Sequence, residues 1–480
     1  MMNGKPCAHT GERNGDSAAD FTARAGDQRS ASIKAEGGQR IRHVIHSDAV
    51  GPKAPTGFCT TSSPCRCLTG DLAGSSVCNR MAATSNNQWH CRSWGETIMR
   101  YIPGALVLAC LLGIATGSVH AQRTEESHMP SASAIAERSY FFVGGSYTGD
   151  PAKQVMHGQM YVEKLTPAHP HQRYPMVLIH GAAQTATNWM GTPDGRAGWA
   201  EFFCAQGYQV YMVDQPARGR SAWQEGIDGK VRTFDAQTIE KLFTAPELHN
   251  LWPQAKLHTQ WPGDGPKHGQ VGDPIFDQFY ASQVQFLVSN AETQTLIQHA
   301  AAALLDKIGP AIVLTHSQSG PFGWLIADAR PKLVKAIVAV EPAGPPFEDV
   351  VVGTGRSRPW GVTDIPIAYD PPVSDPAQLQ IEQQTAPNKP DLVRCWQQKG
   401  PARALANLRN IPVVLITSES SYHAAYDHCT AHYLVQAGVK TDFIRLEEHG
   451  IHGNAHMMML EKNNLRIAGL ITSWLARSVK

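Results

Sequence analysis

Two serines in the stretch THSQSG, from Thr315 to Gly320, are the residues most able to do chemistry in this chain. A serine hydroxyl becomes a nucleophile when a base lies within hydrogen-bond reach and N–H groups stabilise the oxyanion that develops. A strand that turns sharply into a helix exposes such a serine, if small residues stand two before and two after it. Thr315 and Ser319 meet this condition around Ser317, which directly follows the apolar run AIVLTH. We predict Ser317 as the nucleophile; a polar helix cap is the alternative interpretation.

Histidines that could serve as the base lie near the C-terminus, in EEHGIHGNAHMMMLEKNN: they are His449, His452 and His456. Imidazole is the side chain most often used as a general base. The spacing also allows a metal site, but zinc usually requires a further carboxylate, histidine or cysteine, and no His-Glu-x-x-His motif is present. We therefore expect neither a metal nor another cofactor.

A carboxylate that could orient the histidine follows either of two predicted strands. Glu341 comes at the end of AIVAVE, on the strand after that of Ser317, and Glu419 follows IPVVLITS. A carboxylate at either strand end can hold an imidazole and stabilise its charged form. The alternative for Glu341 is a solvated residue at the end of a strand.

A mostly parallel sheet must position these candidates. Two short strands, SYFFVGG and QVMHGQMYVEKL, suggest an antiparallel start. Afterwards apolar strands alternate with helix-like segments, which predicts a sheet covered by helices on both faces. The last predicted helix runs from about His456 to Arg477. Functional residues in such sheets gather at the carboxyl ends of the strands, where all the candidates lie.

Two long stretches, residues 223–298 and 345–410, interrupt this alternation and read as inserted lid or binding segments, with surface decoration as the alternative. Aromatic residues of the first insertion and of the helix after Ser317 could line an apolar pocket or form the core of a lid: Trp252, Trp261, Phe276, Phe279, Tyr280, Phe322 and Trp324.

Several of these segments together resemble the α/β-hydrolase superfamily. VLTHSQSGPFGWLIAD resembles its nucleophile elbow, with Thr and Ser in place of the usual flanking glycines. MVLIHGAAQTATNW resembles its oxyanion strand and loop, YMVDQPARGRS its Asp-x-x-x-x-Gly-x-Ser segment, and GNAHMMMLEKN its histidine loop. The segments span Val177 to Trp474. The resemblance implies an α/β-hydrolase fold with a mostly parallel central sheet and inserted segments.

The resemblance also implies roles for single residues. Ser317 would be the nucleophile, and the backbone N–H groups of Ala182 and Gln318 would form the oxyanion hole. His456 would be the base, because it follows GNA at the place of the family's histidine. His449 and His452 would then be polar loop residues.

The acid departs from the commonest pattern of the superfamily. The position aligned with the usual aspartate is Ser421 in this chain. Some members carry the acid after the preceding strand, and secreted bacterial esterases with an HSQSG-type elbow have a glutamate there. The resemblance therefore implies Glu341 as the acid, with Glu419 in reserve.

The expected activity is that of a serine carboxylic-ester hydrolase acting on small to medium hydrophobic esters through an acyl-enzyme. The same residues could cleave a lactone, an amide, a thioester or a carbon–carbon bond, which the triad alone does not distinguish. A non-catalytic binding protein of the same fold is the alternative of another class.

The composition bounds the partners. The chain has 480 residues, 42 Lys and Arg against 41 Asp and Glu, and a formal net charge of +1. Because the basic residues are spread along the chain, we expect no nucleic-acid partner. The predicted partner is a small-molecule ester.

An export signal is predicted at residues 99–121. It begins at Met99, contains an apolar run too short for the roughly 20 residues of a membrane span, and ends in VHA before Gln122. We expect cleavage after Ala121, a periplasmic or extracellular location and no membrane span afterwards. Attachment of a lipid to Cys110 is the less favoured alternative, because this cysteine lies inside the apolar run.

Residues 1–98 precede this signal and show no sustained hydrophobic periodicity. We interpret them as an over-extended, non-structural start, with a disordered extension as the alternative. The remaining residues, 122–480, form the predicted hydrolase domain. They keep only Cys204, Cys395 and Cys429, so at most one disulfide can form within it.

Overall fold

A computed structural model describes residues 134–479. The predicted signal peptide, the segment before it and Cys110 lie outside the described residues. Between residues 134 and 479, no helix is both long enough and apolar enough to cross a bilayer.

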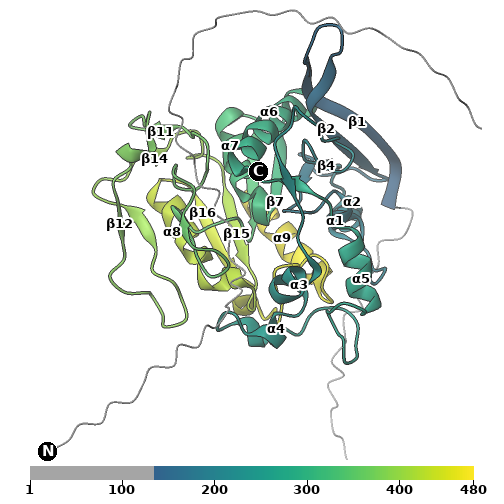
Figure 1. Cartoon of the computed structure of the whole chain (residues 1–480), viewed down its shortest axis with the longest axis vertical. Coiled ribbons are helices and arrows are strands. Elements are labelled where there is room, and N and C mark those ends of the chain that lie inside the picture. The colour runs from purple at the N-terminus through teal and green to yellow at the C-terminus, as the bar shows by residue number, and fades with distance from the viewer. Residues whose placement is uncertain (1–133, 480) are drawn as a thin grey trace, which may run out of the picture. The chain divides into compact units, whose positions relative to one another are not determined.

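An eight-stranded sheet organises the molecule, in the order β1-β2-β4-β3-β7-β8-β15-β16 (Figure 1). Strands β1 and β2 pair antiparallel, as do β2 and β4, and every other neighbouring pair is parallel. The predicted α/β-hydrolase architecture is therefore confirmed. The strands are β1 (Ile135–Thr148), β2 (Val155–Pro167), β3 (Met176–Ile179), β4 (Val210–Asp214), β7 (Ala311–His316), β8 (Val334–Val340), β15 (Val413–Thr417) and β16 (Thr441–Arg445).

Helices cover both faces of this sheet, which explains why the central strands are apolar throughout. Val177 and Ile179 of β3 face one core, and Met176 and Leu178 face the other. The first core lies against α6 (Asn290–Ile308), α7 (Gly320–Ala329) and α8 (Asp427–Gln436). The second lies against α2 (Trp199–Ala205) and α9 (Asn464–Ser478). A strand buried on both faces needs apolar side chains at consecutive positions.

The last helix begins later than the sequence predicts. We expected it from about His456, but α9 begins at Asn464. The Glu461 carboxylate accepts hydrogen bonds from the backbone N–H of Ala455 (2.9 Å) and from Nδ2 of Asn454 (2.6 Å). These bonds hold the turns and bends of residues 456–463, so His456 lies in a loop and not on a helix.

The first insertion is built of short elements, seen around α3, α4 and α5 in Figure 1. Strands β5 and β6 pair antiparallel within it. A short helix, α1 (Thr187–Met190), precedes the insertion. The elements of the insertion are β5 (Val231–Arg232), α3 (Ala236–Ile239), a π-helical turn (Glu240–Thr244), α4 (Pro246–His249), a 3₁₀ turn (Ala255–Leu257), α5 (Pro274–Ala281) and β6 (Phe286–Leu287).

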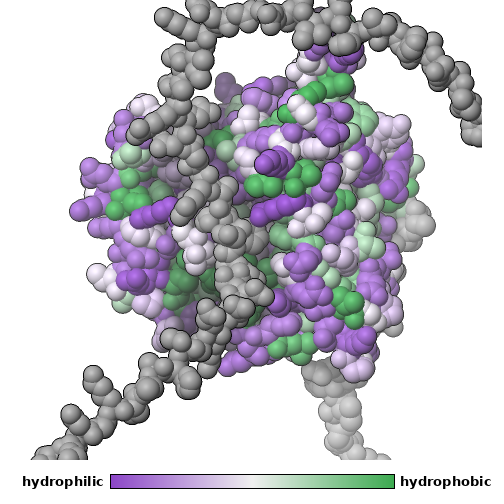
Figure 2. Space-filling view, in the orientation of Figure 1, coloured by the Kyte–Doolittle hydropathy of each residue, from purple (hydrophilic) through white to green (hydrophobic). Residues whose placement is uncertain are grey.

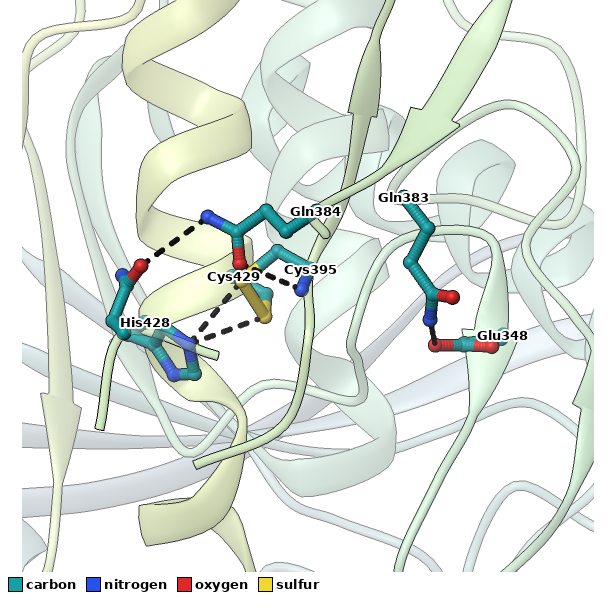
Figure 3. Close-up of a disulfide and its surroundings, with 7 residues drawn as sticks. Glu348, Gln383, Gln384, Cys395, His428 and Cys429 are labelled. Atoms are coloured by element: carbon teal, nitrogen blue, oxygen red, sulfur yellow. Dashed lines mark hydrogen bonds between the residues drawn. A yellow bond between two sulfur atoms is a disulfide. The ribbon is translucent and has the colours of Figure 1, made fainter. Parts of the chain in front are cut away.

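The second insertion contains three small antiparallel pairs, β9 with β10, β11 with β14 and β12 with β13. A disulfide joins Cys395, beside β13, to Cys429 of α8, and Nε2 of His428 lies 3.2 Å from the Cys395 sulfur (Figure 3). Cys204 is a buried free thiol. The strands are β9 (Glu348–Asp349), β10 (Gly355–Arg356), β11 (Tyr369–Asp370), β12 (Ile381–Gln383), β13 (Trp396–Gln398) and β14 (Ala404–Leu405), and a 3₁₀ turn spans Pro376–Gln378.

The aromatic residues singled out from the sequence pack into cores. Trp261, Phe276 and Phe279 belong to the core under α2 and α9, with Tyr280 packed against it, and Phe322 and Trp324 belong to the opposite core. Trp252 packs with Leu242 and Ala255 in a small separate cluster. Of the two interpretations left open, the structure matches the core interpretation.

The surface mixes hydrophilic and hydrophobic residues on the face seen in Figure 2. Tyr140, Phe142 and Tyr147 of the edge strand β1 are exposed aromatic residues. Apolar side chains exposed among polar ones are usual for folded proteins.

Candidate active site

Ser317 occupies a sharp turn between β7 and α7. Its φ of +57° lies in the left-handed region that residues with a Cβ rarely adopt. A 3₁₀ turn, Ser317–Ser319, follows, and α7 begins at Gly320. A Cβ on Gly320 would lie 2.3 Å from Cβ of Pro342, and one on Gly181 would lie 3.0 Å from Cβ of Ser317. The turn therefore depends on glycine at position 320, and a side chain at position 181 would press against Ser317.

Ser319, the other serine of THSQSG, is buried in the turn. Its Oγ accepts a hydrogen bond from the backbone N–H of His316 (2.7 Å) and lies 2.8 Å from the carbonyl oxygen of Ile179, to which it can donate. These bonds join the turn to the end of β3. Ser319 thus holds the turn together, while Ser317 lines a cavity.

His456 and Glu341 continue from Ser317 in a chain of hydrogen bonds. Nε2 of His456 lies 2.9 Å from Oγ of Ser317, and Nδ1 lies 2.6 Å from Oε2 of Glu341. Glu341 directly follows β8, the neighbour of β7, and has a positive φ of +43°. Both His456 and Glu341 are almost completely buried.

The buried carboxylate of Glu341 is well supplied with donors from the loop after β15. It accepts hydrogen bonds from the backbone N–H of Ser418 (2.9 Å), from Oγ of Ser418 and from Oγ of Ser421 (2.7 Å). These donors balance the cost of removing a carboxylate from water. Ser421, which stands at the aligned position of the usual aspartate, therefore holds the glutamate.

Glu419 does not approach His456. Its Oε2 accepts a hydrogen bond from the backbone N–H of Gly453 (2.8 Å), and its Oε1 lies 3.2 Å from Nδ1 of His452. His452 and His449 are both exposed. The structure thus brings Glu341, and not Glu419, to the histidine beside Ser317.

Ala182 and Gln318 line the same cavity as Ser317. Arg218, which the sequence did not single out, connects their two loops: its guanidinium donates to the carbonyl oxygen of Gly181 (2.9 Å) and to Oε1 of Gln318 (3.1 Å). The buried Arg218 therefore fixes the spacing of the two segments.

A second histidine, His423, stacks on His456 with ring centroids 4.9 Å apart and planes 7° apart. Its Nδ1 lies 2.8 Å from Oδ1 of Asp427, and its Nε2 lies 3.1 Å from the hydroxyl of Tyr426. Burial, together with the neighbouring His423, holds the pKa of His456 well below its usual range. His456 is accordingly neutral, and able to accept a proton, at neutral pH.

Tyr422 is a further residue at the site that sequence reasoning missed. Its hydroxyl lies 3.3 Å from Nε2 of His456, and the residue is part of the cavity lining. The only signal for Tyr422 in the sequence was its position directly after Ser421, in the loop that follows β15, because such loops lie at the carboxyl edge of the sheet.

A cavity of about 450 Å³ opens above Ser317. Phe243 of the first insertion lies over His456, with ring centroids 5.0 Å apart. Both insertions supply the walls. The apolar lining includes Phe234, Leu242, Phe243, Phe286, Val288, Val350 and Val352, and the polar lining includes Arg232, Asn290, Asp349 and Arg358.

The first insertion is fastened to the loop that carries His456. His258 lies between two carboxylates, with Nδ1 2.6 Å from Glu247 and Nε2 3.0 Å from Glu461. Burial lowers the pKa of His258, but the hydrogen bonds and charges of the two glutamates outweigh burial and raise the pKa to about 9. The backbone N–H of Thr259 also donates to the carbonyl oxygen of Gly453 (2.9 Å).

Two groups of described residues have the ligand types of a metal site: Glu341 with His423 and His456, and Cys395 with His428 and Cys429. In the first group, both nitrogens of each histidine already have hydrogen-bond partners. In the second, the two sulfurs are joined in the disulfide. In both groups these bonds already engage the atoms that could bind a metal.

The chain was compared with protein-family models, with known proteins and with solved structures. Residues 176–469 match the family model described as "Alpha/beta hydrolase family". The chain is 50% identical over 346 residues to a "Probable secreted lipase phiG" of Fungal sp. (strain ATCC 74256), covering 71% of this chain and 89% of that protein. A solved structure titled "The Atomic Resolution Structure of a Novel Bacterial Esterase" is 24% identical, with a TM-score of 0.47, covering 72% of this chain and 97% of the other.

Proposed function

Because the chain belongs to the alpha/beta hydrolase family, we propose that it is an exported serine carboxylic-ester hydrolase with Ser317, His456 and Glu341 as its triad. The observation that carries this proposal is the unbroken chain of hydrogen bonds from Glu341 through His456 to Ser317, at 2.6 and 2.9 Å, at the wall of a cavity. A nucleophile, a base and an orienting carboxylate in this order are what acyl transfer requires.

In the first half of the reaction, Ser317 Oγ attacks the ester carbonyl carbon while Nε2 of His456 takes its proton. The backbone N–H groups of Ala182 and Gln318 stabilise the oxyanion of the tetrahedral intermediate. Glu341 accepts a hydrogen bond from Nδ1–H of His456 and stabilises the imidazolium. The proton on Nε2 then passes to the leaving alcohol, and an acyl-serine remains.

In the second half, a water molecule takes the place of the alcohol. His456 removes a proton from the water, the resulting hydroxide attacks the acyl-serine, and the proton returns to Ser317 Oγ as the acid leaves. No step requires a cofactor.

The lining of the cavity supports small to medium hydrophobic esters as substrates. A volume of about 450 Å³ lies within the usual range for small-molecule sites, and Phe234, Phe243 and Phe286 offer apolar contact. The name of the 50% identical relative, a probable secreted lipase, is in line with ester hydrolysis and with export.

The test is a panel of chromogenic esters, lactones, thioesters and amides offered to purified residues 122–480. We expect hydrolysis of esters of short to medium acyl length, and stoichiometric labelling by a fluorophosphonate, both lost in Ser317→Ala. Preference for another bond type would reassign the reaction within the fold. Absence of both hydrolysis and labelling in the wild type would leave a binding protein as the better description.

A further inference from the structure

The Tyr422 hydroxyl lies at the atoms that exchange the proton. It is 3.3 Å from Nε2 of His456, the nitrogen that also lies 2.9 Å from Ser317 Oγ. The triad itself has no use for this hydroxyl. A polar group placed beside Nε2 is near any atom that receives the proton from Nε2.

The sheet order places Tyr422 away from the proposed oxyanion donors. Ala182 follows β3 and Gln318 follows β7, whereas Tyr422 follows β15, and the strands are ordered β3-β7-β8-β15. Tyr422 therefore approaches Ser317 from the side of His456. In a tetrahedral intermediate, the leaving oxygen faces the histidine when the oxyanion faces the N–H donors.

The Tyr422 ring is held on several sides. It packs against His456, with ring centroids 4.9 Å apart, and against Trp252, 5.8 Å apart. The indole N–H of Trp252 donates to the carbonyl oxygen of Ser420 (2.9 Å), two residues before the tyrosine. Burial, reinforced by the charge of Glu341, raises the pKa of the Tyr422 hydroxyl well above its usual value, so the hydroxyl stays a neutral donor.

We propose that Tyr422 is a further catalytic residue of the reaction proposed above, and that its hydroxyl donates a hydrogen bond to the leaving oxygen of the ester. As the bond between the acyl carbon and this oxygen breaks, the electron pair moves to the oxygen and the proton of Nε2 passes to it. Tyr422 keeps its own proton throughout and stabilises the negative charge that precedes proton transfer. The aid matters most for alkoxide leaving groups, which are strongly basic.

The test uses the variant Tyr422→Phe, which keeps the ring and removes the hydroxyl. Its kcat/KM is compared with that of the wild type over a series of esters that differ in the leaving group. Acetate esters from ethyl to 4-nitrophenyl share one acyl group, and kcat/KM reports acylation whatever the rate of deacylation. We expect a loss of about 10- to 100-fold for alkyl esters, the range of one hydrogen bond to a developing charge. The 4-nitrophenyl ester, whose leaving group needs little stabilisation, should be hydrolysed at close to the wild-type rate.

Tyr369→Phe is the matched control. Tyr369 is a buried tyrosine outside the cavity, and its hydroxyl contacts the carbonyl oxygen of Trp360 (2.8 Å) and the hydroxyl of Tyr433 (2.7 Å). This variant should show the leaving-group dependence of the wild type. Replacement of Tyr422 by 3-fluorotyrosine keeps the ring and the hydroxyl, so this variant should retain alkyl-ester activity. It also provides a test of the proposal if the phenylalanine variant does not fold.

An equal loss for all leaving groups, no loss for alkyl esters, or loss of alkyl-ester activity in the fluorotyrosine variant would overturn the role of Tyr422. Failure of the esterase proposal has a different signature, because the wild type would then hydrolyse none of the esters. Stoichiometric fluorophosphonate labelling of Tyr422→Phe would show that the variant is folded with a reactive Ser317, so that a loss on alkyl esters is not a loss of the whole site.

Discussion

Ser317 and Glu341 share an unusual backbone conformation. Both have a positive φ, +57° and +43°, although neither is glycine, and both directly follow neighbouring strands of the sheet. Such conformations cost on the order of 1–3 kcal/mol each and persist where surrounding bonds enforce them. The hydrogen bonds of Ser319 enforce the first, and the donors from Ser418 and Ser421 surround the second.

Replacement of Glu341 by glutamine tests the acid. The amide keeps the shape but carries no charge to stabilise the proposed imidazolium. Its NH₂ group replaces one of the two oxygens, so it faces either the donors of Ser418 at Oε1 or Oγ of Ser421 and Nδ1 of His456 at Oε2. We expect kcat for ester hydrolysis to fall by about 10³- to 10⁴-fold. Steady-state kinetics on a 4-nitrophenyl ester give the measurement.

Glu419→Gln is the control for this substitution, because Glu419 contacts Gly453 and His452 instead of His456. It should keep most of the wild-type activity. If Glu419→Gln were the more damaging of the two, the assignment of Glu341 as the acid would be wrong.

The sequence could predict the site residues that have a local signal, and it could not predict those whose place depends on contacts between distant segments. Ser317 lies in a strand-turn-helix pattern that is complete within ten residues, and Glu341 could be found because it ends an apolar strand. Arg218 and Tyr422 could not be found in this way. Arg218 acts on Gln318, 100 residues away, and Tyr422 reaches His456, 34 residues away, so their roles depend on the folded sheet order.

At the scale of elements, the central strands could be predicted because they are buried on both faces and therefore apolar throughout. Helix boundaries were harder to predict where side-chain hydrogen bonds decide them. The runs at β3, β7, β8 and β15 were apolar enough to read directly. The start of α9 was misplaced because the carboxylate of Glu461 holds the preceding loop in turns. The two- and three-residue strands of the insertions have no periodicity from which to predict them.

The bridge of His258 between Glu247 and Glu461 should make stability depend on pH. The pKa of His258 is raised from 6.5 to about 9 in the folded protein. Its contribution to folding is therefore complete below about pH 6.5 and is lost as the pH rises through about 9. Between about pH 6 and pH 10, the unfolding free energy of the wild type should therefore fall by on the order of 3 kcal/mol more than that of His258→Gln. Urea unfolding at about pH 6 and pH 10 measures both.

His452→Gln provides the comparison for this experiment. His452 also contacts a glutamate, Glu419, but its side chain is 62% exposed, so it contributes little. This variant should follow the pH dependence of the wild type. If the unfolding free energies of His258→Gln and the wild type changed equally with pH, protonation of His258 would not be the source of the pH dependence.

At the scale of the whole molecule, the covalent structure bears on where the protein works. The Cys395–Cys429 disulfide closes a loop with a sequence separation of 34 residues and ties the second insertion to α8. Structural disulfides persist in oxidising compartments. This agrees with our proposal that residues 99–121 direct export and are then removed.

Mass spectrometry of the exported protein tests that proposal. We expect the chain to begin at Gln122, Cys395 and Cys429 to appear in one linked peptide pair until reduction, and Cys204 to be alkylated only after unfolding. A lipid-modified chain beginning at Cys110, or one that retains residues 1–98, would contradict it.

The attachment of the first insertion to the histidine loop has a consequence for engineering. The insertion carries the aromatic wall of the cavity, and through His258 and Thr259 it is bonded to the residues on either side of His456. The wall of the proposed substrate pocket and the loop of the proposed base are therefore not separable modules in this chain. A chimera that exchanges residues 223–298 for those of a relative would have to exchange residues 450–462 as well, because a foreign wall would lack the bonds that hold the loop of His456.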